Sequence, residues 1–387
     1  MTRRIPGRKI PGRAVTRRTI AGMLTLGLFG ASGGLGTGAA AADTWTPWQP
    51  VPQPGAGPYA AEAAWPTPSP LVHGSDAPVV YALGGARAPG IPWVEYTMRA
   101  GLGWFPDSRR DLIDYPAGAP FSWMPQGLLP PGPRDNVTIG EAATDATNSL
   151  NRAIWNGIGT DVAVVGLSQG TLALDQEQVR LAGDPKAPPR DQLTFTTIGD
   201  PTSTNGLSKS FLAGIFGPGE YIPLIDYTMP KKVDSQYDAN RIVAAYDGLA
   251  DFPDRPENPF AVANAIAGST IVHTSAAFTT PEVVPPQNIK TEVNSKGAQT
   301  TSFLIPINHL PLTLPLRYLG IPDGTVDMID GALQPIIDAG YSRNDNPDHP
   351  VTVDPNGMDP IAVLDPQSQA AIDEQFAQYR EILSAFG

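Results

Sequence analysis

Cysteine is absent from the 387-residue chain. Its absence excludes disulfide bonds, a thiolate nucleophile, zinc sites built on cysteine and a lipid anchor attached through a cysteine thiol. A chain of this length without disulfides must be stabilised by a sizeable hydrophobic core, in one large domain or two modest ones.

Histidine is scarce, and the four that occur are His73, His273, His309 and His349. No two of them have the short spacing at which paired histidines bind a metal from one element. The histidines therefore predict no metal site, and the sequence implies no organic cofactor. Any chemistry that needs an imidazole must use one of these four residues.

Positive charge is also low, with 26 Lys and Arg against 38 Asp and Glu and a formal net charge of −12. Seven of the basic residues lie within residues 1–42, so the rest of the chain carries 19 basic and 38 acidic residues, a net charge of −19. Such a surface disfavours nucleic acids and anionic membrane surfaces as partners. The composition identifies no protein partner.

The sequence lacks a long uninterrupted apolar run. The apolar stretch 20–35 is broken by five glycines, and it is too short for a comfortable membrane span. It follows a basic segment without acidic residues and precedes a run of alanines, which together predict a signal peptide over residues 1–42 and export to the cell envelope or beyond. The adjacent Arg17 and Arg18 suit a twin-arginine signal as well as an ordinary secretory signal, and both remain open.

Three regions follow the expected signal peptide: a Pro/Ala-rich leader over residues 43–75, a domain over 76–345, and a polar tail over 346–387 whose residues 366–386 suit an amphipathic helix. Within the domain, apolar strand-like runs alternate with helical patterns. This alternation predicts an α/β fold with a mostly parallel sheet covered by helices on both faces. The expected strands include residues 79–83, 111–115, 162–165, 193–198, 242–246 and 301–305, and the expected helices 137–155 and 171–181.

The segment between residues 199 and 240 is rich in glycine, proline and aromatic residues. Long apolar loops over the carboxyl edge of a parallel sheet form lids and acyl-chain pockets, which is one interpretation. The other is an irregular excursion whose apolar residues belong to the core.

A serine stands between two glycines in GLSQG, residues 166–170. The G-x-S-x-G pattern alone is weak, because residues 30–34 also match it and residues 206–210 come close. Only Ser168 follows an apolar strand and precedes a helix, which is the context of a nucleophile elbow. The glycines are expected because a side chain at either place would crowd the turn or the neighbouring strand. The alternative is an ordinary Gly-Ser turn in a Rossmann-like sheet.

A serine nucleophile needs a histidine base and a carboxylate, which follow it in the order Ser, Asp or Glu, His in this kind of sheet. We predict Asp251 as the acid, three residues past Gly248 in the turn after the strand 242–246. Asp247 is the first alternative, although an Asp before Gly also initiates turns. Asp200, which follows another strand, is the second.

We predict His309 as the base, because it follows the last expected strand and both aspartates of that turn. His73 precedes the serine, His349 lies in the polar tail, and His273 falls in a stretch that looks helical in its first part.

The oxyanion hole is expected to combine the backbone N–H of Gln169 with an N–H from the loop after the strand 79–83, where Gly85 and Ala86 lie.

Several stretches together resemble the PE-PPE C-terminal domain family of mycobacteria and their relatives. The resemblance covers residues 79–341 and implies an α/β-hydrolase fold, with Ser168, Asp251 and His309 on the family's serine, acid and histidine motifs. Ala86 departs from the threonine that the family often has there. The stretches are LGGARAPG, DYPAGAPFSW, VVGLSQGTLA, TIGDPTSTNGL, AAYDGLADFPDRP and NHLPLTLPLRYLG.

The resemblance implies an exported serine esterase or lipase that cleaves acyl esters through an acyl-enzyme, with a lipid or other acyl ester as substrate and contact with envelope lipids. The first alternative is an acyltransferase acting on an envelope glycolipid of the trehalose type. The second is a non-catalytic envelope-binding module.

Overall fold

The computed structural model describes residues 67–87, 92–121, 135–204, 206–231 and 234–364, and short pieces of helix between 369 and 381. The expected signal peptide and all but the last residues of the expected leader lie outside the described residues. So does much of the helix expected over 366–386.

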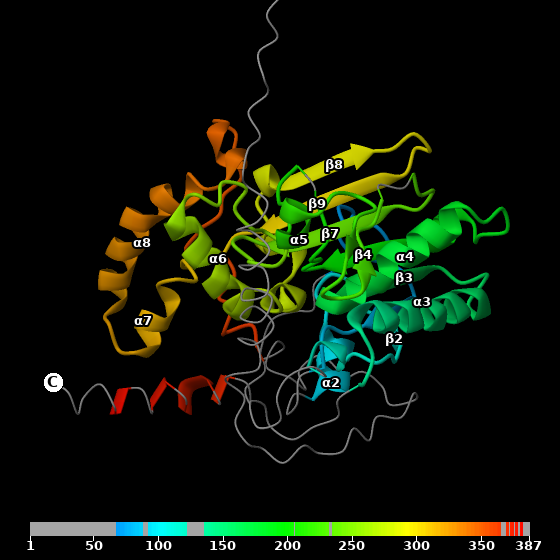
Figure 1. The fold of residues 1–387 in the computed structure, drawn as a ribbon, viewed down its shortest axis with the longest axis horizontal. Coiled ribbons are helices and arrows are strands. Elements are labelled where there is room, and N and C mark those ends of the chain that lie inside the picture. Colours follow the sequence, from blue (N-terminus) through cyan, green and yellow to red (C-terminus); the bar gives the residue numbers. More distant parts are fainter. Residues whose placement is uncertain are drawn as a thin grey trace, which may run out of the picture.

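A seven-stranded sheet forms the centre of the molecule, in the order β2-β1-β3-β4-β7-β9-β8 (Figure 1). Each neighbouring pair is parallel except β8 with β9. The predicted parallel α/β sheet is therefore confirmed. The strands are β1 Val79–Leu83, β2 Arg109–Leu112, β3 Val162–Leu167, β4 Leu193–Ile198, β7 Ala239–Ala244, β8 Ile289–Val293 and β9 Gln299–Ile305.

Both faces of the sheet are buried, as β3 illustrates. All six of its residues are buried, with Val162 and Val164 in one hydrophobic cluster and Ala163 and Val165 in a second. Successive side chains of a strand point to opposite faces. The continuous apolar run of this strand therefore reflects a layer of packing on each side.

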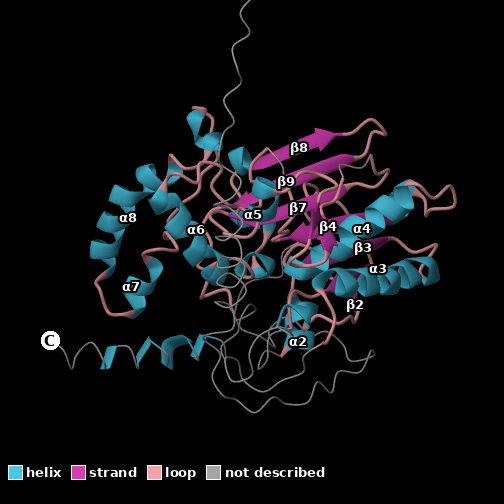
Figure 2. Ribbon diagram, in the orientation of Figure 1, coloured by secondary structure: helices cyan, strands magenta, loops and turns pink. Residues whose placement is uncertain are grey.

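Two long helices cover the first face, α3 Ile139–Asn156 and α4 Thr171–Ala182 (Figure 2). Helix α3 begins with a capping box, in which the Thr138 hydroxyl accepts from the Glu141 N–H and the Glu141 carboxylate accepts from the Thr138 N–H. This pairing satisfies two of the free N–H groups at the start of the helix.

Helices α6 Pro259–Ile271 and α8 Asp323–Asp338 contribute Ala261 and Ile337 to the second cluster. They stand with α7 Leu314–Tyr318 beyond the end of β9, at the left of Figure 1. No pattern recognised in the sequence predicted α7, α8 or the antiparallel edge strand β8.

The segment between β4 and β7 contains the short helix α5 Phe211–Ile215 and a small hairpin of β5 Tyr221–Ile222 and β6 Tyr227–Thr228. Most of its apolar side chains are buried in the first cluster. This favours the interpretation of the segment as an irregular excursion whose apolar residues belong to the core. The residues of the segment in this cluster are Phe211, Leu212, Ile222, Ile225, Tyr227, Met229 and Tyr237.

Part of the expected polar tail packs on the domain. Ile307, just after β9, forms bridges with Val353 and Met358, and Met358 is buried in the second cluster.

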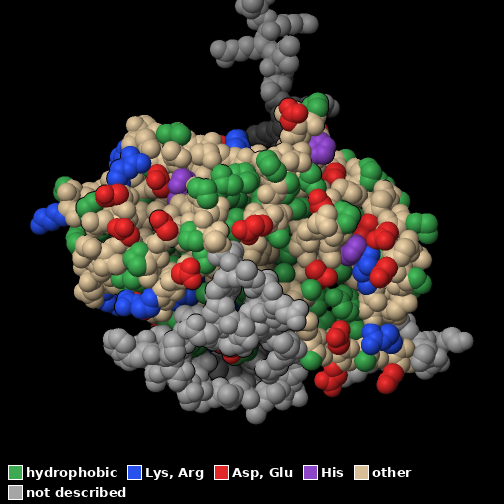
Figure 3. Space-filling model, turned by 180° about the vertical axis from the view of Figure 1, so that it is seen from behind, with side chains coloured by type: hydrophobic (Ala, Val, Ile, Leu, Met, Phe, Trp, Pro, Cys, Tyr) green, Lys and Arg blue, Asp and Glu red, His purple; other side chains and the backbone are tan. Residues whose placement is uncertain are grey.

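Charged side chains of both signs are interspersed with hydrophobic ones over the face shown in Figure 3. No helix among the described residues combines the length and apolar character needed to cross a membrane.

Candidate active site

Ser168 occupies a strained turn between β3 and α4. Its φ angle is +50°, in the left-handed region that non-glycine residues rarely adopt. A methyl group added at Gly170 would lie 2.6 Å from the carbonyl oxygen of Gly84, and one at Gly166 would lie 2.9 Å from Leu174 Cδ1. The predicted tight turn, with glycines required on both sides, is confirmed.

His273 joins this serine to a buried carboxylate. Its Nε2 atom lies 2.8 Å from Ser168 Oγ, and its Nδ1 atom lies 2.8 Å from Asp247 Oδ2. All three side chains are buried. A neutral imidazole that donates from Nδ1 to the carboxylate accepts from the serine hydroxyl at Nε2, so the arrangement suits proton transfer away from Ser168.

Asp247 is oriented by the backbone of its own turn after β7. Its Oδ1 atom accepts hydrogen bonds from the N–H groups of Leu249 and Ala250, at 2.9 and 3.3 Å. The carboxylate therefore initiates the turn and faces the imidazole at the same time.

Helix α6 places His273 by packing directly on this turn. A methyl group at Gly268 would lie 1.9 Å from the carbonyl oxygen of Tyr246, and one at Gly248 would lie 2.0 Å from the carbonyl oxygen of Ala265. Such close approach is available only to glycine. His273 follows two residues after the end of α6, so the packing of the helix fixes the position of the imidazole.

Gly199, directly after β4, packs against the imidazole of His273. Its φ angle is +62°, and a methyl group there would lie 3.1 Å from His273 Cε1. Glycine thus serves here for both its conformation and its lack of a side chain.

The structure does not bring Asp251 to the histidine, which corrects the predicted acid. The fully buried Asp251 pairs instead with Arg343, whose Nη2 atom donates to Oδ2 at 2.9 Å, and it accepts from the Tyr246 N–H at 2.8 Å. Burial raises the pKa of the Asp251 carboxyl, and the guanidinium of Arg343 opposes that rise. Asp251 is thus engaged by Arg343 and the turn backbone, and Asp247 takes the place beside the imidazole.

His309 also lies elsewhere, in a group of charges on α7 and α8. Its Nδ1 atom lies 3.1 Å from Arg317 Nη2 and 3.2 Å from Asp330 Oδ2. The loop after β9 leads toward the helices at that end of the molecule, so its histidine faces their charges and not Ser168.

The remaining candidate residues have other partners. His73 Nε2 lies 3.0 Å from Thr301 Oγ1, and His349 Nδ1 lies 3.0 Å from the carbonyl oxygen of Pro350. Asp200 accepts from Thr202.

A buried polar network lies beneath the nucleophile turn. The Thr171 hydroxyl donates to the carbonyl oxygen of Ser168 at 2.6 Å, and the Thr202 hydroxyl lies 2.9 Å from Asp175 and 2.8 Å from Asp200. Burial and the neighbouring charge of Asp200 raise the pKa of Asp175 to about 7, against the lowering effect of Arg241.

The predicted oxyanion-hole loop passes beside the serine. A methyl group at Gly85 would lie 3.2 Å from Ser168 Cβ. The carbonyl groups of Gly84 and Gly85 accept from Tyr115 Oη and Trp93 Nε1, at 2.6 and 2.7 Å. In a trans peptide the N–H points opposite to the carbonyl, so the N–H groups of Gly85 and Ala86 point away from this aromatic pair.

A model of the PE-PPE domain family matches residues 106–342 of the chain. The chain belongs to the PE-PPE domain family. The resemblance inferred from the sequence is confirmed, and so is the α/β-hydrolase-like fold.

Three curated relatives of this PE-PPE chain come from Mycobacterium tuberculosis H37Rv. Diacyltrehalose acyltransferase Chp2 is 58% identical over 351 residues, covering 89% of this chain and 94% of the relative. SL1278 acyltransferase Chp1 is 42% identical, over 62% of this chain and 56% of the relative. Esterase PE16 is 36% identical, over 61% of this chain and 45% of the relative.

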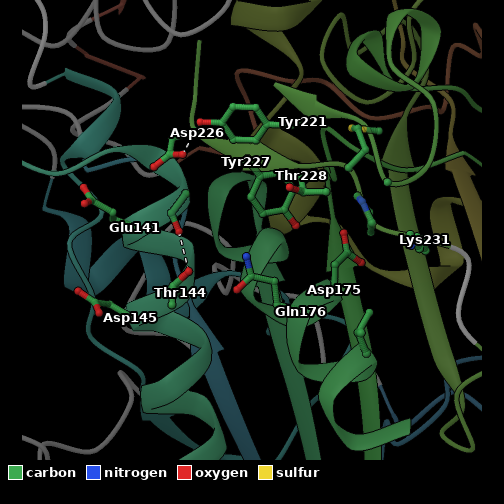
Figure 4. A pocket seen from close by; sticks show the side chains of 15 residues that line it. Glu141, Thr144, Asp145, Asp175, Gln176, Tyr221, Asp226, Tyr227, Thr228 and Lys231 are labelled. Carbon is green, nitrogen blue, oxygen red and sulfur yellow. Dashed lines mark hydrogen bonds between the residues drawn. The ribbon is translucent and has the colours of Figure 1, made fainter. Parts of the chain in front are cut away.

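The PE-PPE domain has a cavity of about 660 Å³ between α3, α4 and the β5–β6 hairpin (Figure 4). Part of its acidic lining already has hydrogen-bond partners within the protein, because the Asp226 carboxylate accepts from the Tyr221 and Thr138 hydroxyls. None of the triad-like residues lines it. Across the described residues of the domain, no three acidic or histidine side chains are grouped as a metal site requires.

Proposed function

We propose that this PE-PPE protein is a serine-dependent acyltransferase, with Ser168 as nucleophile, His273 as general base and acid, and Asp247 as the carboxylate that orients the imidazole. The observation that carries the proposal is the position of His273 between Ser168 Oγ and the Asp247 carboxylate, each 2.8 Å away. An intact arrangement of this kind argues against a module that only binds envelope components.

In the first half-reaction, Ser168 Oγ attacks the carbonyl carbon of an acyl ester while its proton passes to His273 Nε2. The negative charge of Asp247 stabilises the imidazolium that forms. The imidazolium then protonates the leaving alkoxide, the ester C–O bond breaks, and the acyl group remains on Ser168.

The oxyanion of the tetrahedral intermediate needs two backbone donors. The N–H of Gln169 and an N–H of Gly85 or Ala86 are the proposed pair, because the Gly85 backbone runs next to Ser168 with its carbonyl turned to the core. The Ala86 backbone can supply this donor without the hydroxyl of the threonine that the family often has there.

In the second half-reaction, an acceptor hydroxyl gives its proton to His273 and attacks the acyl-enzyme. Similarity to a diacyltrehalose acyltransferase over 94% of that relative's length supports a trehalose-type glycolipid as acceptor. Water is the second candidate, since a further relative is an esterase. Both acceptors use the same triad. The export signal expected over residues 1–42 agrees with an acceptor in the cell envelope.

Labelling of the purified protein with a fluorophosphonate probe tests the nucleophile. Label on the wild type that is lost in Ser168→Ala and His273→Ala, but kept in His309→Ala, supports the proposed triad. An unlabelled but folded wild type contradicts it. Incubation with an acyl ester and trehalose, followed by mass spectrometry, then separates transfer from hydrolysis.

A further inference from the structure

Gln169 has a buried side chain without a hydrogen-bond partner. The residue is 6% exposed. Among the described residues, neither its Oε1 nor its Nε2 atom has a hydrogen-bond partner. Buried polar side chains are paired in the large majority of cases, and each exception needs an explanation. A carboxamide that lacks both kinds of partner retains one acceptor and two donors for a ligand.

Two other glutamines of the following helix provide a comparison. Gln176 Oε1 accepts from the Thr147 hydroxyl at 2.9 Å, and Gln178 Nε2 donates to the carbonyl oxygen of Leu174 at 3.4 Å. Both side chains on α4 find partners within the protein. The unpaired glutamine is the one that directly follows the nucleophile.

Gln169 directly follows the nucleophile in the chain. Its backbone N–H is a proposed oxyanion donor, so its side chain starts next to the reacting carbonyl. The neighbouring groups are already engaged, since Ser168 Oγ pairs with His273 and Thr171 donates to the Ser168 carbonyl. The carboxamide of Gln169 is therefore free to bind a group carried by the substrate.

We infer that the Gln169 carboxamide binds a second hydroxyl of a sugar acceptor, beside the hydroxyl that attacks the acyl-enzyme. This inference rests on the proposed function and deepens it. The attacking hydroxyl gives its proton to His273 Nε2, its oxygen bonds to the acyl carbon, the bond to Ser168 Oγ breaks, and the proton returns to Ser168. A neighbouring hydroxyl of the same sugar is both donor and acceptor, which matches the carboxamide.

This contact distinguishes a sugar from water. A water molecule has one oxygen, so a water positioned for attack at His273 cannot also occupy the place beside Gln169. A sugar carries adjacent hydroxyls and can fill both places at once. Gln169 therefore acts as a positioning residue that favours transfer to a polyol over hydrolysis.

The test compares Gln169→Met with Gln178→Met, the same change on the same stretch of chain. The full chain is acylated with a p-nitrophenyl acyl ester, and the products formed with trehalose, with ethanol and with water alone are quantified. We expect Gln169→Met to lower the ratio of trehalose transfer to hydrolysis by about tenfold. This is the effect on the rate of losing one hydrogen bond to a bound hydroxyl. The ratio of ethanol transfer to hydrolysis in Gln169→Met should stay within about twofold of the wild-type ratio, because any general loss of activity lowers both products alike. Gln178→Met should match the wild type in all three products.

Two results overturn the inference. Equal losses for trehalose, ethanol and water in Gln169→Met mean that the side chain supports the nucleophile turn, and an unchanged ratio means that it contacts no acceptor. Failure of the proposed function is recognised separately, because the wild type would then neither bind the fluorophosphonate nor release a burst of p-nitrophenol. Thermal unfolding of both variants checks that they are folded.

Discussion

His273 Nε2 lies 2.8 Å from Ser168 Oγ across a separation of 105 residues in the chain. The contact depends on the packing of α6 on the turn after β7, where Gly268 meets the Tyr246 carbonyl and Gly248 meets the Ala265 carbonyl. The imidazole is thus held by a helix that packs without intervening side chains, and each part of this arrangement can be tested.

Replacement of His273 by alanine should abolish acyl-enzyme formation, because no other imidazole of the described chain reaches Ser168. A triad histidine contributes on the order of 10⁴- to 10⁶-fold to turnover. His309→Ala should retain activity within a few fold, since that side chain pairs with Arg317 and Asp330. Burst kinetics with a p-nitrophenyl ester measure both. The reverse pattern would restore His309 as the base.

Asp247→Asn and Asp251→Asn should separate activity from stability. Asp247→Asn should lower turnover by about 10⁴-fold, because an amide can support the wrong tautomer of His273. Asp251→Asn leaves the buried Arg343 without its counter-charge, which should lower the free energy of unfolding by about 3–5 kcal/mol. Urea unfolding and ester turnover measure the two effects. A normal unfolding midpoint for Asp251→Asn would mean that the ion pair does not stabilise the turn.

Gly268→Ala should displace α6 and reduce both stability and turnover. The added methyl group would lie 1.9 Å from a backbone oxygen, so the helix must move and carry His273 with it. Gly331→Ala on α8 is the matched control, because that site has open space around it and alanine favours a helix over glycine by about 1 kcal/mol. In circular dichroism melts, the midpoint should therefore fall for Gly268→Ala and rise for Gly331→Ala, and only Gly268→Ala should lose turnover. Equal behaviour would mean that the contact of α6 with the turn is not required.

Asp175 should make the protein less stable as the pH rises from about 4 to 7. Burial and the charge of Asp200 raise its pKa in the folded state to about 7, above the usual 3.8, so the folded state binds an additional proton in that range. Stability then falls with pH, by at most about 1.4 kcal/mol per pH unit from this group. Asp175→Asn removes the effect, and its stability relative to the wild type should increase between pH 5 and pH 8 in urea titrations. A constant difference would show that Asp175 ionises normally.

Local parts of the site were predictable from the sequence. The apolar strand, the glycine-flanked serine and the helix are contiguous, so the turn at Ser168 could be identified from neighbouring residues alone. β1 and β4 have the predicted bounds for the same reason. The proposed acid and base were not predictable in this way, because the choice between Asp247 and Asp251 depends on which side each carboxylate faces after the turn.

In the sequence, Asp247 is a weaker candidate than Asp251 for the carboxylate of the triad, because an aspartate before glycine commonly initiates a turn. The structure shows that the two roles are compatible, since one carboxylate accepts from the Leu249 N–H and faces His273. Chain order also admits His273, which follows both aspartates of the turn. The sequence did not reveal that α6, which follows Asp247, brings the chain back to Ser168. This happens ahead of β8 and β9 in the chain.

The ion pair of Asp251 with Arg343 limits where this domain can be truncated. The family match ends at residue 342, one position before the arginine. A fragment ending there would contain Ser168, His273 and Asp247, yet it would leave a carboxylate buried and unpaired at the turn that carries the acid. The smallest unit that keeps the proposed triad intact therefore extends past the sequence match, into a stretch that neutralises a buried charge.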